Sequence, residues 1–114
     1  MAYLYDPADI RVERREMGRD LLLIVTGGDA HIGAVSMAYA EEGRVRVETS
    51  TVPGHKESVL SEPAALQAAR LLACTVTVAM GIHYDGLNRE QIEEIGSIVS
   101  IRIEEALNEA AKLI

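Results

Sequence analysis

One apolar strand that ends in two glycines and a histidine most constrains how this chain can fold. It lies in Asp20 to Gly33, DLLLIVTGGDAHIG, where both alternating sets of side chains are apolar up to the glycines. Such a run predicts a central strand that is covered on both faces. A second apolar strand, Thr75 to Ile82, ends the same way, with Gly81 just before His83. If the two strands lie side by side, their ends form the floor and rim of a small-molecule site.

The alternation of apolar and polar residues predicts five strands. They are Ile10–Met17, Asp20–Thr26, Gly33–Ala40, Arg44–Thr49 and Thr75–Ile82. Ser61 is predicted to cap a helix that continues to about Ala73, and Asn88, with Gln91 at the capping-box position, opens the last helix. The order β-β-β-β-α-β-α predicts a single α+β domain over residues 1–114 with an antiparallel four-strand start. We expect a two-layer sandwich whose mostly antiparallel five-stranded sheet has two helices on one face.

Charge and composition exclude several classes of function. The net charge of −7 and the isoelectric point near 4.9 argue against nucleic acid, which requires clustered Lys and Arg. The N-terminal residues lack an apolar signal core and no stretch is long enough to span a bilayer, so we expect a cytoplasmic protein without a membrane partner. The single cysteine, Cys74, has apolar neighbours and is expected to be a buried, inert thiol.

The last helix has one apolar stripe and two isoleucines outside it. The stripe consists of Ile92, Ile95, Val99, Ile103, Ala106, Ala110 and Leu113, and we expect it to face the sheet. Ile98 and Ile101 lie well away from the stripe, among glutamates. Two isoleucines on the wrong face suggest a second contact surface, so the sequence predicts a homodimer. The alternative is that they are harmless exposed apolar residues.

All three histidines of the chain, His31, His55 and His83, follow strand ends with a glycine close by. Three imidazoles can hold a divalent metal ion and leave one position open for chemistry. The intervals of 24 and 28 residues form no local ligand motif, so loop histidines that only make hydrogen bonds are the alternative.

Thr26-Gly27-Gly28 is a candidate anion site, because glycines let successive backbone N–H groups point into one concavity. The segment matches neither a P-loop nor a dinucleotide-binding fingerprint. A tight turn is the alternative reading. The cations near these landmarks are Lys56, Arg70 and protonated histidine.

Three separated segments resemble a known family. They are TGG-x-x-HIG from Thr26 to Gly33, HK-E from His55 to Glu57, and GIH from Gly81 to His83, which is followed by Gln91-Ile92. Together they resemble the small accessory proteins of gallate decarboxylase, a family also described as prenylated-flavin chaperones. The likeness covers about half of the chain.

The resemblance implies an accessory protein without catalytic turnover of its own. Members of the family are thought to hold prenylated FMN, an oxygen-sensitive cofactor made by a flavin prenyltransferase, and to help deliver it to a UbiD-type aromatic acid decarboxylase. Backbone amides and cationic side chains would hold the phosphate, and aliphatic side chains would face the prenylated ring. The cofactor-binding residues that the resemblance implies are Thr26, Gly27, Gly28, His31, Gly33, His55, Lys56, Gly81 and His83.

Two other functions fit the residues. The first is a small metal-dependent enzyme, a hydrolase or lyase, with His31, His55 and His83 as ligands of a divalent metal ion. A metal ion could also bridge a flavin phosphate in the chaperone reading. The second is a structural adaptor in which the glycines and histidines only form turns. Convergence of the three histidines on one cavity is the observation that both ligand-binding readings require.

Overall fold

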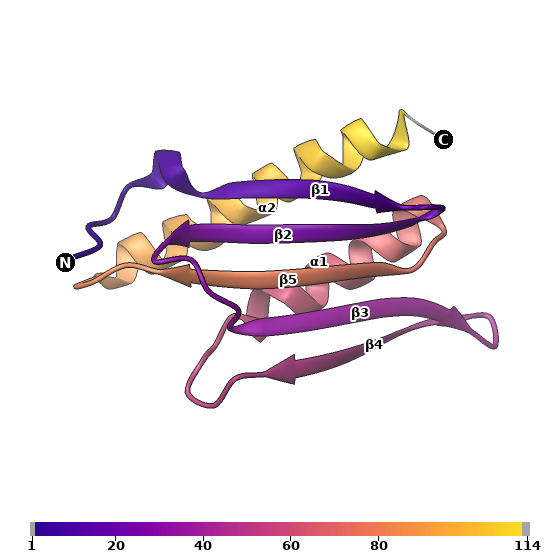
Figure 1. The fold of residues 1–114 in the computed structure, drawn as a ribbon, viewed down its shortest axis with the longest axis horizontal. Coiled ribbons are helices and arrows are strands. Elements are labelled where there is room, and N and C mark those ends of the chain that lie inside the picture. Colours follow the sequence, from indigo (N-terminus) through magenta and orange to yellow (C-terminus); the bar gives the residue numbers. More distant parts are fainter. Residues whose placement is uncertain (1, 113–114) are drawn as a thin grey trace.

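A five-stranded sheet forms one layer of the protein and two helices form the other (Figure 1). The computed structural model describes residues 2–112. A short 3-10 turn, η1 (Pro7–Asp9), precedes β1 (Arg11–Met17), β2 (Asp20–Gly28), β3 (Ala34–Glu41), β4 (Arg44–Thr51), α1 (Ser58–Leu72), β5 (Val76–His83) and α2 (Arg89–Ala111). Both helices cover the same face of the sheet, so the predicted α+β class and two-layer arrangement are confirmed.

The strands lie in the order β1-β2-β5-β3-β4, and every neighbouring pair is antiparallel except β2 and β5. The antiparallel four-strand start is therefore wrong between β2 and β3, because β5 is inserted there. Since β3 is antiparallel to both β4 and β5, the chain passes from β4 through α1 to a strand that runs in the same direction. This insertion places the ends of the two apolar strands β2 and β5 side by side, with Gly28 opposite His83.

The core lies between the sheet and the helices. Alternate residues of β2 and β5 face the helices, and Leu23, Val25, Val76 and Val78 are fully buried there. The predicted stripe on α2 supplies Ile95, Val99, Ile103 and Ala110 to this core, together with Leu107. Ile92 also belongs to the predicted stripe, but its side chain is exposed. Ala106 is partly buried at the margin of the core, and Leu113 lies outside the described residues.

The start of α1 differs from the prediction. The helix begins at Ser58 rather than at Ser61, because the backbone carbonyl of Glu57 already accepts hydrogen bonds from the N–H groups of Leu60 and Ser61. Ser61 is not a cap but a fully buried residue, and its hydroxyl lies 2.8 Å from that of Ser36 on β3. The capping box at Asn88 and Gln91 is confirmed by both of its hydrogen bonds.

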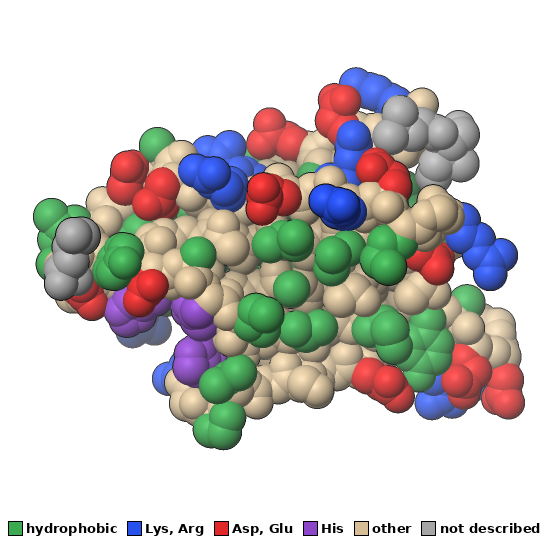
Figure 2. Space-filling model, viewed as in Figure 1, with side chains coloured by type: hydrophobic (Ala, Val, Ile, Leu, Met, Phe, Trp, Pro, Cys, Tyr) green, Lys and Arg blue, Asp and Glu red, His purple; other side chains and the backbone are tan. Residues whose placement is uncertain are grey.

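The second face of the sheet lacks a covering layer within residues 2–112 (Figure 2). Leu22 and Ile24 of β2 point to this open face and remain partly exposed. The expectation that β2 is covered on both faces is therefore wrong for this chain alone, because both helices lie on the other side. The strand also continues through Gly27 and Gly28, which pair with β5 instead of breaking the pattern.

The N-terminal segment is held against the end of β5 and the start of α2. Backbone atoms of Tyr3 and Asp85 form a hydrogen bond of 2.8 Å, and the Asp85 carboxylate accepts a second bond from the Tyr3 N–H. The rings of Tyr5 and Tyr84 pack edge to face with centroids 5.3 Å apart. The Tyr84 hydroxyl donates to the carboxylate of Asp9, and the Tyr5 hydroxyl donates to that of Glu94.

This arrangement predicts that stability falls at alkaline pH. Burial and the hydrogen bond to Glu94 raise the pKa of Tyr5 to about 12, and burial and Asp9 raise the pKa of Tyr84 even further. Because each pKa is higher in the folded state than the ordinary value of 10.0, the stabilisation is complete below pH 10 and is lost as the pH rises through the folded values. We expect a lower free energy of unfolding in urea at about pH 11 than at about pH 9. A chain that is equally stable at both pH values would contradict this.

Two further expectations concern the thiol and membranes. Cys74 is partly buried, and burial, followed by the nearby Asp20 carboxylate, raises the pKa of its thiol. A raised pKa leaves less thiolate, so the geometry agrees with an unreactive cysteine.

Over residues 2–112, neither helix combines the length and apolar character that crossing a bilayer requires.

Candidate functional site

The loop between β2 and β3 must cross the end of β5, because β5 lies between those two strands. His31 is on this loop, and its backbone passes directly over Gly81 of β5. A Cβ atom at Gly81 would lie only 1.6 Å from the carbonyl oxygen of His31. The glycine therefore allows the close crossing that sets the His31 side chain above the end of β5.

Glu57 connects the segment before α1 to the same place. Its carboxylate accepts a hydrogen bond of 3.3 Å from the backbone N–H of Ile82, just beyond the point where β3 stops pairing with β5. A Cβ atom at Gly33 would come within 2.4 Å of this carboxylate, so Gly33 leaves the room that Glu57 occupies. The two glycines Gly33 and Gly81 thus shape the site by permitting close approach.

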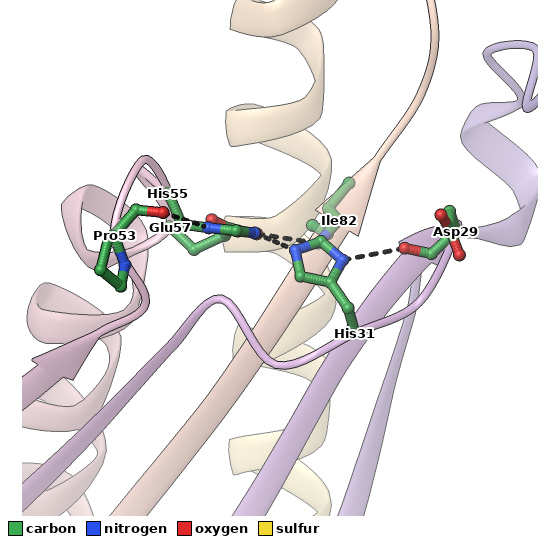
Figure 3. A network of polar contacts seen from close by, with 6 residues as sticks. All are labelled: Asp29, His31, Pro53, His55, Glu57 and Ile82. Carbon is green, nitrogen blue, oxygen red and sulfur yellow. Dashed lines mark hydrogen bonds and ion pairs between the residues drawn. The ribbon is translucent and has the colours of Figure 1, made fainter.

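Both ring nitrogens of His31 face an oxygen atom (Figure 3). Its Nδ1 lies 2.9 Å from the backbone carbonyl oxygen of Asp29, which only accepts, so Nδ1 carries the proton of this bond. Its Nε2 lies 2.8 Å from Oε2 of Glu57, and the two side chains are 27% and 12% exposed. This contact has the distance of an ion pair, but within residues 2–112 Nε2 has no partner in hydrogen-bond geometry. Nε2 is therefore a buried nitrogen that faces a carboxylate oxygen without a well-directed hydrogen bond.

The other two histidines lie close by. The ring of His55 is centred 5.0 Å from that of His31, and its Nδ1 lies 3.2 Å from the carbonyl oxygen of Pro53. His83, the last residue of β5, is half exposed and has Nε2 3.0 Å from Oδ1 of Asp85. The Tyr3 backbone N–H and then His83 lower the pKa of the Asp85 carboxyl, which keeps Asp85 ionised beside His83.

The three imidazoles meet around one open hollow of about 430 Å³. It is lined by Asp29, His31, Gly54, His55, Lys56, Glu57, Ile82 and His83. The hollow collects side chains from the β2–β3 loop, the segment before α1 and the end of β5, as Figure 2 shows by the purple histidines beside one recess. The predicted residues His31, His55, Lys56 and His83 are thus brought together, and the size falls within the range of small-molecule sites.

Thr26, Gly27 and Gly28 lie elsewhere. They border a separate hollow of about 350 Å³ with Arg11 and other residues near the start of β1. A Cβ atom at Gly28, which has φ +65°, would lie 2.0 Å from the carbonyl oxygen of His83. That same carbonyl accepts the N–H of Asp29, so the structure uses the diglycine to pack β2 against β5.

A metal centre at the three histidines is not supported by this geometry. Among residues 2–112, no three His, Cys, Asp or Glu side chains are placed to hold one metal ion. Nε2 of His31 is directed to the Glu57 carboxylate, and Nε2 of His83 is directed to Asp85. Nitrogens that face separate carboxylates do not share one coordination centre.

A family model described as the prenylated flavin chaperone LpdD-like domain matches residues 5–111. The chain belongs to this family. A curated relative, Protein LpdD of Lactiplantibacillus plantarum, is 37% identical over 79 residues, which cover 67% of this chain and 58% of that protein. The alignment thus spans less than two thirds of that relative's length.

The hollow of this LpdD-like chain contains a residue, Glu57, that the sequence did not single out. Glu57 was visible only as the last letter of the HK-E segment, yet its carboxylate contacts both His31 and the end of β5. The signal that could have found it is Gly33, since a glycine at the start of a strand leaves room for a neighbouring side chain. Because Glu57 is only two residues after His55, its side chain could also have been expected near the β2–β3 loop.

Proposed function

We propose that this LpdD-like chain binds prenylated FMN at the histidine-lined hollow and helps deliver it to a UbiD-type decarboxylase. It would act in the cytoplasm as a non-catalytic accessory protein, and a flavin prenyltransferase would supply the cofactor. Membership of the prenylated flavin chaperone family supports this role. Prenylated FMN would supply its reactivity to the client decarboxylase, and the residues of this chain would bind and orient it.

The single observation that carries the proposal is the convergence of His31, His55, Lys56 and His83 on one hollow. These residues come from three segments that are far apart in the sequence and provide nitrogen groups, while the carboxylates of Asp29 and Glu57 also line the hollow. A phosphate group accepts charge-assisted hydrogen bonds from such donors. Because Nε2 of His31 already faces the Glu57 carboxylate, the donors we propose for the phosphate are His55, Lys56 and His83.

The ring end of the cofactor requires apolar contacts, and these come from the rims of the site. Ile82 is the aliphatic residue that lines the hollow itself. Ile32 follows His31 and Val52 precedes Pro53, and their side chains are 65% and 43% exposed. Exposed aliphatic side chains on the same two segments are available to cover a prenylated ring.

An anaerobic titration with prenylated FMN, followed by flavin fluorescence, tests the proposal. We expect saturable binding at one equivalent per chain and about tenfold weaker binding for Lys56→Ala, because one charge-assisted hydrogen bond contributes about 1.5 kcal/mol. His83→Ala should weaken binding in the same direction. Arg44→Ala is the matched control, since it removes a cation from the first position of β4, at the other end of the sheet. Absence of saturation, or equal weakening by the control, would contradict cofactor binding at this hollow.

A further inference from the structure

A second hollow lies at the end of the sheet opposite to the three histidines. It has a volume of about 540 Å³ and exists because β3 and β4 continue past the start of β5. β5 begins at Val76, opposite Ala38, whereas the pairing of β3 with β4 extends to Glu41 and Arg44. α1 ends at Leu72, and the β3–β4 turn projects beyond the last turn of this helix (Figure 1). The helix side of the hairpin end is therefore left uncovered.

The floor of this hollow is apolar. Ala40 of β3 pairs with Val45 of β4, and both belong to the alternating set that faces the helices, as does the buried Ala38. Ala69, in the last turn of α1, closes the floor from the helix side and is itself buried. The side chains of Ala40, Val45 and Ala69 are short, so they leave room above them for the hydrocarbon part of a ligand.

Two guanidinium groups border the hollow, and they come from segments that are far apart in the sequence. Arg19 lies in the turn between β1 and β2, and Arg70 lies in the last turn of α1. Within residues 2–112, neither side chain takes part in an ion pair. Both therefore have hydrogen-bond donors available for an anion.

One carboxylate also lines the hollow, and the fold already uses it. Oδ1 of Asp20 accepts a hydrogen bond of 3.0 Å from the backbone N–H of Thr75, just before β5. Burial, followed by this carboxylate, raises the pKa of the neighbouring Cys74 thiol, which therefore stays neutral near pH 7. Among the described residues of the lining, the two positive charges of Arg19 and Arg70 and the one negative charge of Asp20 leave one positive charge in excess. A single excess charge suits a carboxylate better than a phosphate group, which carries nearly two negative charges at neutral pH.

We infer that this hollow binds a small organic acid that has one carboxylate on a compact apolar body. The carboxylate accepts hydrogen bonds from Arg19 and Arg70, because planar guanidinium groups match its two oxygen atoms. The apolar body packs against Ala40, Val45 and Ala69. The volume of about 540 Å³ lies within the range of small-molecule sites.

This site is separate from the one proposed for the cofactor. Asp20 begins β2, whereas Gly28 ends it beside His83 of the histidine-lined hollow. The nine residues of β2, at about 3.3 Å per residue, separate the two ends of the strand by roughly 26 Å. The inference therefore does not depend on cofactor binding.

Titration of the purified chain with benzoate, followed by two-dimensional NMR of the backbone amides, tests the inference. Benzoate combines one carboxylate with an apolar ring. We expect saturable shifts at the amides of Arg19, Ala69 and Cys74, while those of His31 and His83 stay unchanged. Acetate has the carboxylate without a comparable apolar body, and inorganic phosphate has neither group. Each of these two anions should bind at least about tenfold more weakly than benzoate, because the apolar contact is lost.

Variants of the two arginines identify the groups that hold the carboxylate. Arg19→Gln and Arg70→Gln should each weaken benzoate binding about tenfold, because each removes a charge-assisted hydrogen bond. Arg89→Gln is the matched control, since Arg89 is an exposed arginine at the start of α2 and does not line the hollow. Thermal unfolding of each variant without benzoate shows that the chain is still folded.

Three results would overturn the inference. Benzoate shifts at Arg19, Ala69 and Cys74 that do not saturate would show that the hollow is not a binding site. Acetate or phosphate binding as tightly as benzoate would show only a general attraction of anions to the two arginines. Equal weakening by Arg89→Gln would assign the loss to the overall charge of the chain. None of these results bears on the cofactor, whose binding is measured separately with prenylated FMN at the histidine-lined hollow.

Discussion

Replacing Gly81 by alanine is expected to lower the free energy of unfolding by about 3 kcal/mol, because the new Cβ would collide with backbone rather than with a movable side chain. The obstructing atom is the carbonyl oxygen of His31, 1.6 Å from the ideal Cβ position. The β2–β3 loop would have to lift away from β5, and His31 would move with it. Urea denaturation monitored by circular dichroism measures the loss.

Gly96→Ala is the matched control for this substitution. Gly96 lies inside α2, where the added Cβ would meet only the end of the Leu60 side chain at 3.8 Å. Alanine is the better helix former, so this variant should gain about 0.5 to 1 kcal/mol in free energy of unfolding. If Gly81→Ala were as stable as Gly96→Ala, the close crossing of the loop over β5 would be wrong.

The second large effect is expected for Glu57→Ala, which should lower the free energy of unfolding by about 2 kcal/mol. The substitution removes the acceptor of the Ile82 N–H and the partner of His31 Nε2 together. A partly buried N–H without an acceptor retains its full desolvation cost. Denaturation in urea near neutral pH provides the measurement.

Glu57→Gln separates the hydrogen bond to the Ile82 N–H from the contact of the negative charge with His31. A glutamine side-chain oxygen can still accept from Ile82, whereas the negative charge beside His31 is gone. We expect this variant to lose about half as much free energy of unfolding as Glu57→Ala. A wild-type unfolding midpoint for Glu57→Ala would show that this carboxylate does not join the segment before α1 to β5.

Local sequence patterns predicted the helices and strands of this fold well. They predicted less well which strands lie side by side in the sheet. The apolar runs that became β2 and β5 and the capping box at Asn88 are each specified by adjacent residues. The insertion of β5 between β2 and β3 depends on pairing between residues more than 50 positions apart, as in Leu21 with Val76. Periodicity contains no information about such long-range pairing, so consecutive antiparallel pairing was the simpler expectation.

The helix starts show the same limit. Ser61 has the residue type and the following Glu62-Pro63 that favour an N-cap, and local propensity placed the start there. The structure instead buries the Ser61 hydroxyl against Ser36, a contact between residues that are 25 positions apart. A tertiary hydrogen bond thus displaced the predicted cap by one turn.

At the site, the sequence predicted that the three histidines would lie together, and the structure adds what surrounds the glycines. His31, His55 and His83 do share one hollow, because the β2–β3 loop, the segment after β4 and the last residue of β5 lie at the same end of the sheet. The diglycine was a candidate anion cradle with a tight turn as the alternative, and the structure shows that Gly28 permits close packing against the backbone of His83. A glycine that permits a close crossing and a glycine that exposes its amide have the same sequence signal.

We propose that prenylated FMN occupies the hollow between the three histidines. Two-dimensional NMR of the imidazole groups during an anaerobic titration with the cofactor tests it most directly. We expect the signals of His31, His55 and His83 to shift together and saturate at one equivalent, while the amides of Arg19 and Cys74 at the opposite end of the sheet stay unchanged. Unchanged imidazole signals with saturable shifts at Arg19 and Cys74 would contradict it.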